Sequence, residues 1–328
     1  MKAKKSLGQN FLKSALALKK IVEAGDISSE DIILEIGSGK GALTEKLLEK
    51  SDHVIAIEKD RELFEFLQNK FKKEIKDKKL ILINEDILEF NSSETIPKFL
   101  SGPRFPGSLS QPDHAKNFEL FRWKIIANIP YNITGAILKK FLTEKNQPER
   151  MILMVQNEVA KRIVAHDGKE SILSISVKAY GDPKMVMKVP ARYFSPAPKV
   201  DSAVISIKNI SRKVFTSPQP SPTPPDLPLS GEANGFPLTR GSKGVKGEGE
   251  KIDEDEFWEI IRTGFAHKRK KLSSNLKKLI DPLLISPLAG GEKHTKNIFL
   301  YLENKRAEEL TLADWINLAK SITINKKG

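Results

Sequence analysis

The fold is decided by the stretch Ile32-Ile33-Leu34-Glu35-Ile36-Gly37-Ser38-Gly39-Lys40-Gly41. Its apolar first half predicts a buried strand, and its glycines predict a tight turn into a helix through residues 42–48. Glycines at such a turn allow a ligand to approach the backbone and the N-terminus of the helix. The turn therefore suits a nucleotide-like cofactor. Gly37-x-Gly39-x-x-Ala42 also fits the looser dinucleotide fingerprint, so an enzyme that uses a nicotinamide cofactor stays open at this point.

Alternating strand and helix patterns continue beyond this stretch. Apolar runs predict further strands at residues 53–57, 80–83, 124–127 and 151–155, with helical patterns between them. This rhythm predicts an α/β fold: a doubly wound, mostly parallel sheet with helices on both faces. We also expect later strands at residues 172–189 and 200–207, separated by the corner Pro196-Ala197-Pro198.

Three stretches rich in Pro, Gly and Ser interrupt the pattern, at about residues 101–118, 211–251 and 283–293. The middle one cannot bury enough apolar surface to order itself, so we expect a flexible linker. After it, amphipathic patterns predict helices at residues 253–265, 268–280 and 311–322. The chain is therefore expected to divide into an α/β domain (1–210), a linker (211–251) and a small basic helical domain (252–328).

Bulk composition excludes several classes of protein. The chain has 328 residues, enough for two domains, and no Cys, which rules out disulfides, thiolate zinc sites and cysteine nucleophiles. That composition is compatible with the reducing cytoplasm. The five His residues show no metal-ligand spacing, so no metal is expected, and no apolar run approaches membrane-spanning length. The N-terminus lacks the apolar core of a signal peptide.

The positive charge is concentrated in two regions. The formal net charge is +13, and no acidic residue occurs between Met1 and Val22. A second cluster reads His267-Lys268-Arg269-Lys270-Lys271. Such clusters suit a polyanion such as nucleic acid, although a solvated helix face explains any one cluster equally well. The expected nucleic-acid contacts are Lys4, Lys5, Lys268, Arg269, Lys270 and Lys271.

Polar residues follow successive predicted strands. In open α/β sheets, ligands bind beyond the carboxyl ends of the strands, so these residues should share one site. Glu58 follows the second strand, where its carboxylate can accept both hydrogen bonds of a ribose diol. Asp86 follows the third strand and can accept a hydrogen bond from an adenine amino group. Each carboxylate taken alone is equally explained as an ordinary strand-end residue.

The fourth strand ends in Asn128-Ile129-Pro130-Tyr131. The Asn128 amide oxygen and a carbonyl in the proline turn can accept hydrogen bonds from an exocyclic NH₂ group, and the Tyr131 ring can stack on the base. Two acceptors on the N6 hydrogens of adenine localise a lone pair that is otherwise delocalised into the ring, and no strong general base is then required. Hydride transfer has no use for this group, so the motif favours methyl transfer to a base amine over a nicotinamide enzyme.

These residues resemble the ribosomal RNA adenine dimethyltransferase family, and within it the small-subunit branch. The resemblance covers nearly the whole chain outside the three interrupting segments. It rests on Leu7-Gly8-Gln9-Asn10-Phe11-Leu12, residues 35–41, Ile57-Glu58, Glu85-Asp86-Ile87, residues 128–132, residues 194–204, and Phe265 with the basic run to Leu276.

The resemblance implies a class I S-adenosylmethionine-dependent methyltransferase fold. It implies S-adenosylmethionine as methyl donor and, as acceptors, two adjacent adenosines in a 3′-terminal hairpin of 16S rRNA in the small-subunit precursor. Tyr131 would stack on the flipped base and Phe194 would form a second aromatic wall. The helical domain would bind rRNA, and the protein would be a cytoplasmic monomer. The implied cofactor contacts are Asn10, Leu12, Gly37, Gly39, Glu58, Asp86 and Asn128.

The chain departs from the family pattern at Ile129, where Leu is common, and in its interrupting segments. Three rivals remain: a 23S rRNA adenine methylase, a non-catalytic RNA-binding assembly factor and a DNA adenine methylase. Residues 194–204 and the basic run at 268–271 favour the small-subunit branch over the 23S enzyme. The complete set of strand-end residues argues against lost activity.

Overall fold

The computed structural model describes residues 3–4, 7–100, 123–216, 252–277, 279 and 304–327. The predicted segments 101–118 and 283–293, and residues 217–251 of the predicted linker, lie outside the described residues. The chain forms two compact units. The first comprises Met1–Val164 and Tyr180–Ser211, and the second comprises Ala165–Ala179 and Arg212–Gly328.

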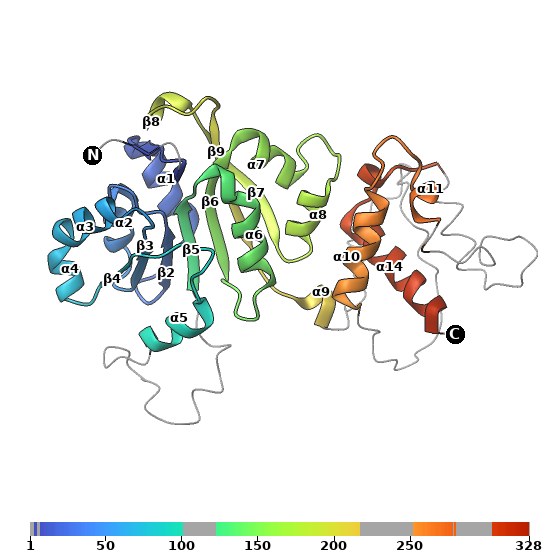
Figure 1. Cartoon of the computed structure of the whole chain (residues 1–328), viewed down its shortest axis with the longest axis horizontal. Helices are drawn as coiled ribbons and strands as arrows, with labels where there is room; N and C mark the ends of the chain where they lie inside the picture. The colour runs from blue at the N-terminus through green and yellow to red at the C-terminus, as the bar shows by residue number, and fades with distance from the viewer. Residues whose placement is uncertain are drawn as a thin grey trace, which may run out of the picture. The chain divides into compact units, whose positions relative to one another are not determined.

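A seven-stranded sheet forms the centre of the first unit (Figure 1), in the order β4-β3-β2-β5-β6-β9-β7. The first five strands in this order are parallel, and β9 lies antiparallel between β6 and β7. The predicted mostly parallel sheet is thus confirmed. The strands are β2 (Ile32–Ile36), β3 (Val54–Ile57), β4 (Leu80–Ile83), β5 (Trp123–Asn128), β6 (Arg150–Gln156), β7 (Asp182–Val189) and β9 (Ser202–Lys208).

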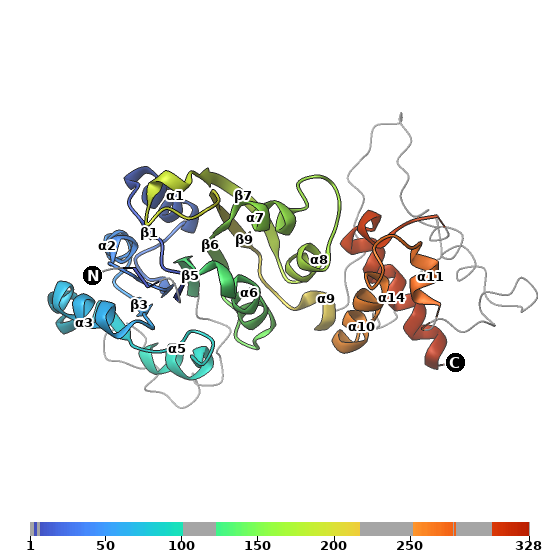
Figure 2. The same ribbon diagram turned by 45° about the horizontal axis from the view of Figure 1, so that its top comes forward.

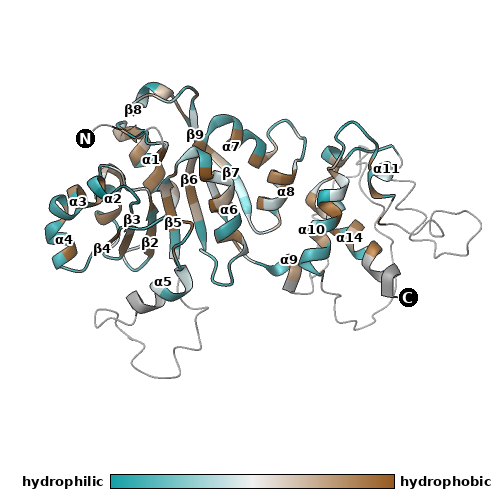
Figure 3. Ribbon diagram, viewed as in Figure 1, coloured by the Kyte–Doolittle hydropathy of each residue, from teal (hydrophilic) through white to brown (hydrophobic). Residues whose placement is uncertain are grey.

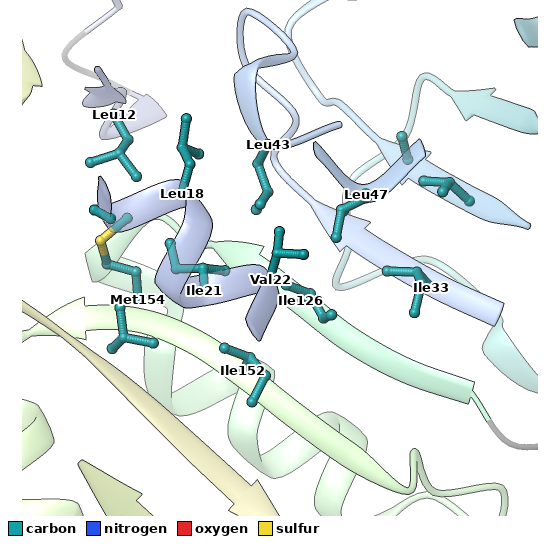
Figure 4. Packing of buried hydrophobic residues seen from close by; sticks show 14 of the residues in the cluster. Leu12, Leu18, Ile21, Val22, Ile33, Leu43, Leu47, Ile126, Ile152 and Met154 are labelled. Atoms are coloured by element: carbon teal, nitrogen blue, oxygen red, sulfur yellow. The ribbon is translucent and has the colours of Figure 1, made fainter. Parts of the chain in front are cut away.

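Helices cover both faces of this sheet, as Figures 1 and 2 show. Successive strand residues point to opposite faces. On one face, Ile126 packs with Ile21 of α1 in the buried cluster of Figure 4. On the other, the Trp123 ring meets Phe141 of α6 at 6.0 Å between ring centroids. The helices of this unit are α1 (Ala15–Gly25), α2 (Ala42–Leu48), α3 (Arg61–Lys70), α4 (Lys72–Lys76), α5 (Ser92–Leu100), α6 (Thr134–Thr143) and α7 (Asn157–Val164).

Apolar burial explains why the central strands read as near-continuous hydrophobic runs. Every residue of β2 and β3 is buried, and Figure 3 shows these strands as mostly hydrophobic. A sheet covered by helices on both faces requires this pattern. Burial of both faces also leaves the carboxyl ends of the strands as the natural position for polar residues.

A small second sheet joins distant parts of the chain. β1 (Phe11–Leu12) pairs antiparallel with β8 (Phe194–Ser195), and Leu12 lies opposite Phe194. Leu12 and Phe194 both belong to the buried apolar cluster of the main sheet. The pairing therefore holds the N-terminal segment beside residues 194–195.

The predicted strand at residues 172–189 is wrong in its first half. Ile172–Lys178 forms helix α8, and only Asp182–Val189 forms strand β7. A reciprocal pair of hydrogen bonds between Ser171 and Ser174 caps α8, and such a capping box stabilises the start of a helix. Residues 172–178 also belong to the second unit, and Ser174, Ile175 and Val177 are its buried residues in this helix.

The second unit is helical among its described residues. It contains α8, α9 (Lys213–Thr216), α10 (Glu254–Gly264), α11 (Leu272–Leu276) and α14 (Leu312–Lys327). Phe257, Leu272 and Trp315 are fully buried, and the Phe265 ring stacks on Trp315 at 5.5 Å between centroids. No helix in the described part of the chain is both long and apolar enough to span a membrane.

The predicted helix at residues 268–280 is much shorter than expected. Among the described residues, it comprises only Leu272–Leu276, and Lys271 is its N-cap. Lys268, Arg269 and Lys270 lie in the turn that precedes it. The Asn275 side chain donates hydrogen bonds to the backbone oxygens of Gly264 and His267, which stabilises this turn.

Candidate active site

A pocket lies at the carboxyl ends of β2, β3, β4 and β5 in the first unit. Residues from all four strand ends line it, together with the N-terminal segment Leu7–Asn10. The structure thereby brings together most of the residues predicted from the sequence. Those lining the pocket are Asn10, Gly37, Gly39, Glu58, Asp86, Asn128, Ile129, Pro130 and Tyr131.

The glycine turn has the backbone conformation that its sequence predicts. Gly37, Gly39 and Gly41 have φ angles of 72°, 58° and 75°, in the left-handed region that glycine adopts without strain. A Cβ atom at Gly39 would also lie 3.0 Å from Cδ1 of Phe11. Glycine is therefore required at position 39 both for its backbone angle and for close packing against the N-terminal segment.

Glu58 organises the backbone around the pocket. Its side chain is buried with only 6% of the residue exposed. Oε2 accepts the N–H of Gly39 at 2.8 Å, and Oε1 accepts the N–H of Asp60 at 2.8 Å. Burial raises the pKa of Glu58 above its ordinary value, and these backbone hydrogen bonds oppose the rise. Each oxygen keeps a lone pair that can accept a ribose hydroxyl.

Asp86 is paired with a residue that the sequence reasoning did not single out. Lys59 Nζ donates to Asp86 Oδ2 at 2.6 Å, and the N–H of Leu88 donates to Oδ1 at 3.0 Å. The hydrogen bond from Lys59 lowers the pKa of Asp86 below its ordinary value. Asp86 is thus an ionised acceptor at the pocket edge, and Lys59, which also lines the pocket, adds a cation beside it.

Asp60 ties the N-terminal segment to the start of α3. Lys4 Nζ donates to Asp60 Oδ1 at 2.8 Å, and Gln9 Nε2 donates to Oδ2 at 2.7 Å. Burial alone would raise the pKa of Asp60, but the hydrogen bonds from Lys4, Gln9 and the N–H of Glu62 lower it overall. This connection holds Gln9 and its neighbours against the pocket.

The orientation of the Asn128 amide follows from its hydrogen bond. Its Nδ2 donates to the backbone oxygen of Asn10 at 3.1 Å. A carbonyl accepts only from a donor, so the NH₂ group must face Asn10 and Oδ1 must face away from it. Among the described residues, no group donates to this Oδ1. Asn128 therefore offers the pocket a free acceptor, as a bound amino group requires.

Tyr131 begins the short 3₁₀ turn Tyr131–Ile133 that follows β5. Its hydroxyl lies 2.5 Å from Oγ of Ser202 in β9. Burial raises the pKa of this phenol above its ordinary value, so it stays protonated at neutral pH. Tyr131 is one of the residues that line the pocket.

Several predicted residues lie elsewhere. Phe194 is only 2% exposed and packs in the apolar core beside Leu12, so neither side chain lines the pocket. Its pairing with β1 turns Phe194 into the core, and its role as a second aromatic wall stays a prediction. Lys4 is occupied by Asp60 and Glu62. Lys5 lies outside the described residues, and Lys268 to Lys271 belong to the second unit.

Sequence reasoning missed contacts between residues that lie far apart in the chain. Lys59, Ser202 and Asp60 act through partners distant in the chain, and only Asp60 had a local signal, as the N-cap of a helix. Among the described residues, no group of three or more His, Asp or Glu side chains could hold a metal ion.

Comparison with known proteins decides the family. The family model described as ribosomal RNA adenine dimethylase matches residues 1–217. The chain belongs to this family. Membership confirms the predicted family and the predicted activity, S-adenosylmethionine-dependent dimethylation of rRNA adenine. The hydrogen-bond acceptors of the pocket fit S-adenosylmethionine: Glu58 can accept hydrogen bonds from its ribose hydroxyls, and Asp86 can accept one from its adenine amino group.

The chain is similar along almost its whole length to small-subunit enzymes. Ribosomal RNA small subunit methyltransferase A of Dehalococcoides mccartyi (strain CBDB1) is 34% identical over 325 residues, which cover 97% of this chain and 88% of the relative. The protein of the same name from Caldanaerobacter subterraneus subsp. tengcongensis is 34% identical over 316 residues, covering 93% and 97%.

Two solved structures show the same fold. A dimethyladenosine transferase from Plasmodium falciparum has a TM-score of 0.65 and 24% identity, covering 97% of this chain and 98% of that chain. The 23S rRNA methyltransferase ErmE has a TM-score of 0.61 and 18% identity, covering 96% and 100%. At these identities the likeness concerns the fold alone, and it confirms the predicted class I methyltransferase architecture.

Proposed function

We propose that this rRNA adenine dimethyltransferase acts on two adjacent adenosines in a 3′-terminal hairpin of 16S rRNA during small-subunit biogenesis. The product is N6,N6-dimethyladenosine at each position. The observation that carries the proposal is the free amide oxygen of Asn128, which is oriented by Asn10 in the same pocket as Glu58. An acceptor for a base amine and an acceptor for a ribose diol thus share one site.

The residues of the chain would position the reacting groups rather than transfer protons. Asn128 Oδ1 and a carbonyl of the Ile129–Pro130 turn accept the two N6 hydrogens, which directs the nitrogen lone pair out of the ring plane. The Tyr131 ring stacks on the flipped base. S-adenosylmethionine supplies the methyl group. The amine loses its proton on methylation, and water can accept it, so no side chain with a shifted basic pKa is needed.

Glu58, Asp86 and the glycine turn would hold the donor. Glu58 has one free lone pair on each oxygen for the ribose hydroxyls. Asp86 would accept the adenine amino group beside Lys59. Gly37 and Gly39 allow the donor to approach the backbone. The segment through Asn10 closes the pocket over it.

The basic turn of the second unit would bind the rRNA backbone. Lys268, Arg269, Lys270 and Lys271 are exposed, and a turn displays them in several directions at once. Phosphate contacts of this kind provide affinity without reading sequence. Lys4 is not among the proposed rRNA contacts, because its ammonium group pairs with Asp60. We further propose that the protein is a cytoplasmic monomer.

Methylation of separated ribosomal subunits tests this function. Small and large subunits from a strain without the modification are incubated with the protein and labelled S-adenosylmethionine, and modified adenosines are mapped by mass spectrometry of rRNA fragments. We expect two adjacent dimethyladenosines near the 3′ end of 16S rRNA. Label on 23S rRNA would support the rival large-subunit activity, and binding without label would support the assembly-factor reading.

A further inference from the structure

We propose that Ser202 is a positioning residue: its buried hydroxyl fixes the ring of Tyr131 so that its face meets the target base. The inference rests on the proposed role of Tyr131 in stacking. The two oxygens lie 2.5 Å apart, although the residues belong to different elements, the turn after β5 and strand β9. They lie in two separate motifs, residues 128–132 and 194–204, and nothing in the sequence alone pairs the two residues.

Ser202 is a rigid anchor. It is 0% exposed and begins β9, where it lies opposite Gln156 of β6 and Val189 of β7. A strand paired on both sides moves little. The preceding residue is fixed as well, because the oxygens of Asp201 accept the N–H groups of Asn157 at 3.0 Å and Ala191 at 2.9 Å.

Tyr131, in contrast, lies on a short turn outside the sheet. The backbone of the turn holds one end of the Tyr131 side chain. Without a second contact at the other end, the ring could move between staggered rotamers. The hydrogen bond to Ser202 holds the other end, so the direction of the long axis of the ring is fixed. Stacking on a flipped base requires a ring that stays in one place, because stacking depends on the relative position of two rings.

The hydroxyl of Ser202 is not needed for the strand itself. Ser206 lies on the same strand and is also buried, at 4% exposure, yet its Oγ has no hydrogen-bond partner among the described residues. β9 therefore tolerates an unsatisfied hydroxyl, and an apolar residue would suit its core position. Tyr131 in turn needs a partner, because an unpaired buried phenol hydroxyl is costly.

A double-mutant cycle tests the proposal. Ser202→Ala and Tyr131→Phe each remove the hydrogen bond from one side, and the double variant removes both hydroxyls. We expect each single variant to lower kcat/KM for small subunits by about 3- to 10-fold, as for a neutral hydrogen bond. The double variant should be no worse than either single variant, because the two changes break one interaction.

Two further readouts separate positioning from a structural role. In a hairpin RNA with 2-aminopurine at the target position, stacking on Tyr131 should quench the fluorescence, and Ser202→Ala should weaken the quenching. The affinity for S-adenosylmethionine, measured by calorimetry, should not change. Ser206→Ala is the matched control and should leave kcat/KM and quenching unchanged. If Ser202→Ala does not fold, Tyr131→Phe still tests the hydrogen bond, because it removes the hydroxyl on the other side and leaves β9 unchanged.

The outcomes distinguish this proposal from the function on which it rests. If the wild-type protein methylates small subunits but the two substitutions act additively, the role of Ser202 is overturned and the function stands. The same conclusion follows if Ser206→Ala is as damaging as Ser202→Ala. If the wild type methylates no rRNA, the proposed function fails, and the positioning role fails with it.

Discussion

Replacing Glu58 by Ala should cost most of the affinity for S-adenosylmethionine. Each Glu58 oxygen already accepts one backbone N–H at 2.8 Å, which leaves one acceptor position per oxygen for the ribose hydroxyls. Two hydrogen bonds to a charged group are worth about 3–6 kcal/mol together. Part of this gain is offset by the cost of burying the charged carboxylate, and the same burial raises the pKa of Glu58. We therefore expect a loss of about 2–4 kcal/mol, or about 30- to 700-fold in Kd.

Isothermal titration calorimetry with S-adenosylmethionine measures this loss directly. Glu58→Gln keeps the shape and one acceptor oxygen, so its Kd should rise by an intermediate factor of about tenfold. Glu85→Gln is the matched control, because Glu85 lines the same pocket and the substitution removes the same charge. Its Kd should change by less than about threefold. An unchanged Kd in a folded Glu58→Ala protein would refute the assignment of the ribose site to Glu58.

Three further predictions follow from individual residues of the first unit. Burial raises the pKa of Glu35 from 4.5 to about 7. The folded protein therefore binds an extra proton between these values, and its free energy of unfolding should fall by up to about 3 kcal/mol relative to Glu35→Gln as the pH rises from 4.5 to 7. The free energies come from urea unfolding of both proteins. The same pH dependence in the wild type and in Glu35→Gln would contradict the prediction. Asp60→Asn keeps a good helix N-cap but replaces an oxygen that accepts a hydrogen bond from Lys4 or Gln9 by an NH₂ group. Calorimetry should therefore show about 3- to 10-fold weaker binding of S-adenosylmethionine. Equal affinity would show that this contact does not shape the pocket. Gly41→Ala should lower the melting temperature, because φ is 75° and the new Cβ would lie 2.6 Å from the Phe71 ring, whereas Gly135→Ala, with open space around it, should not.

The sequence was sufficient to predict the sheet and the strand-end residues. Strands β2 to β6 are near-continuous apolar runs, and such runs, bounded by turn residues, carry a strong local signal. The carboxyl ends of parallel strands meet at one edge, so Glu58, Asp86 and Asn128 could be placed in one site before any coordinates.

Features that depend on distant partners escaped prediction. Leu173, Ile175 and Val177 alternate as in a strand, but the capping box at Ser171 and the backbone bond from Glu170 to Glu308 set a helix there. The spacing of apolar residues shows neither the local capping box nor the long-range contact of Glu170.

A long-range contact also explains why the Phe194 side chain points into the core. A pair of two-residue strands, β1 and β8, is too short to show any periodicity, yet their register decides which way this ring points. The hydrogen bond between Tyr131 and Ser202 likewise joins a turn to a strand with no shared motif. Both cases concern side-chain direction, which pattern alone leaves open.

The central claim is that Asn128 positions the adenine N6 for methylation, and one single-turnover measurement tests it most directly. Asn128→Ala is mixed in excess with small subunits that lack the modification and with saturating S-adenosylmethionine, and the rate of dimethyladenosine formation is followed. We predict a rate about 10²- to 10³-fold below that of the wild type, with subunit binding unchanged, because one transition-state acceptor is lost. Methylation at the wild-type rate would contradict the claim and place the acceptor elsewhere.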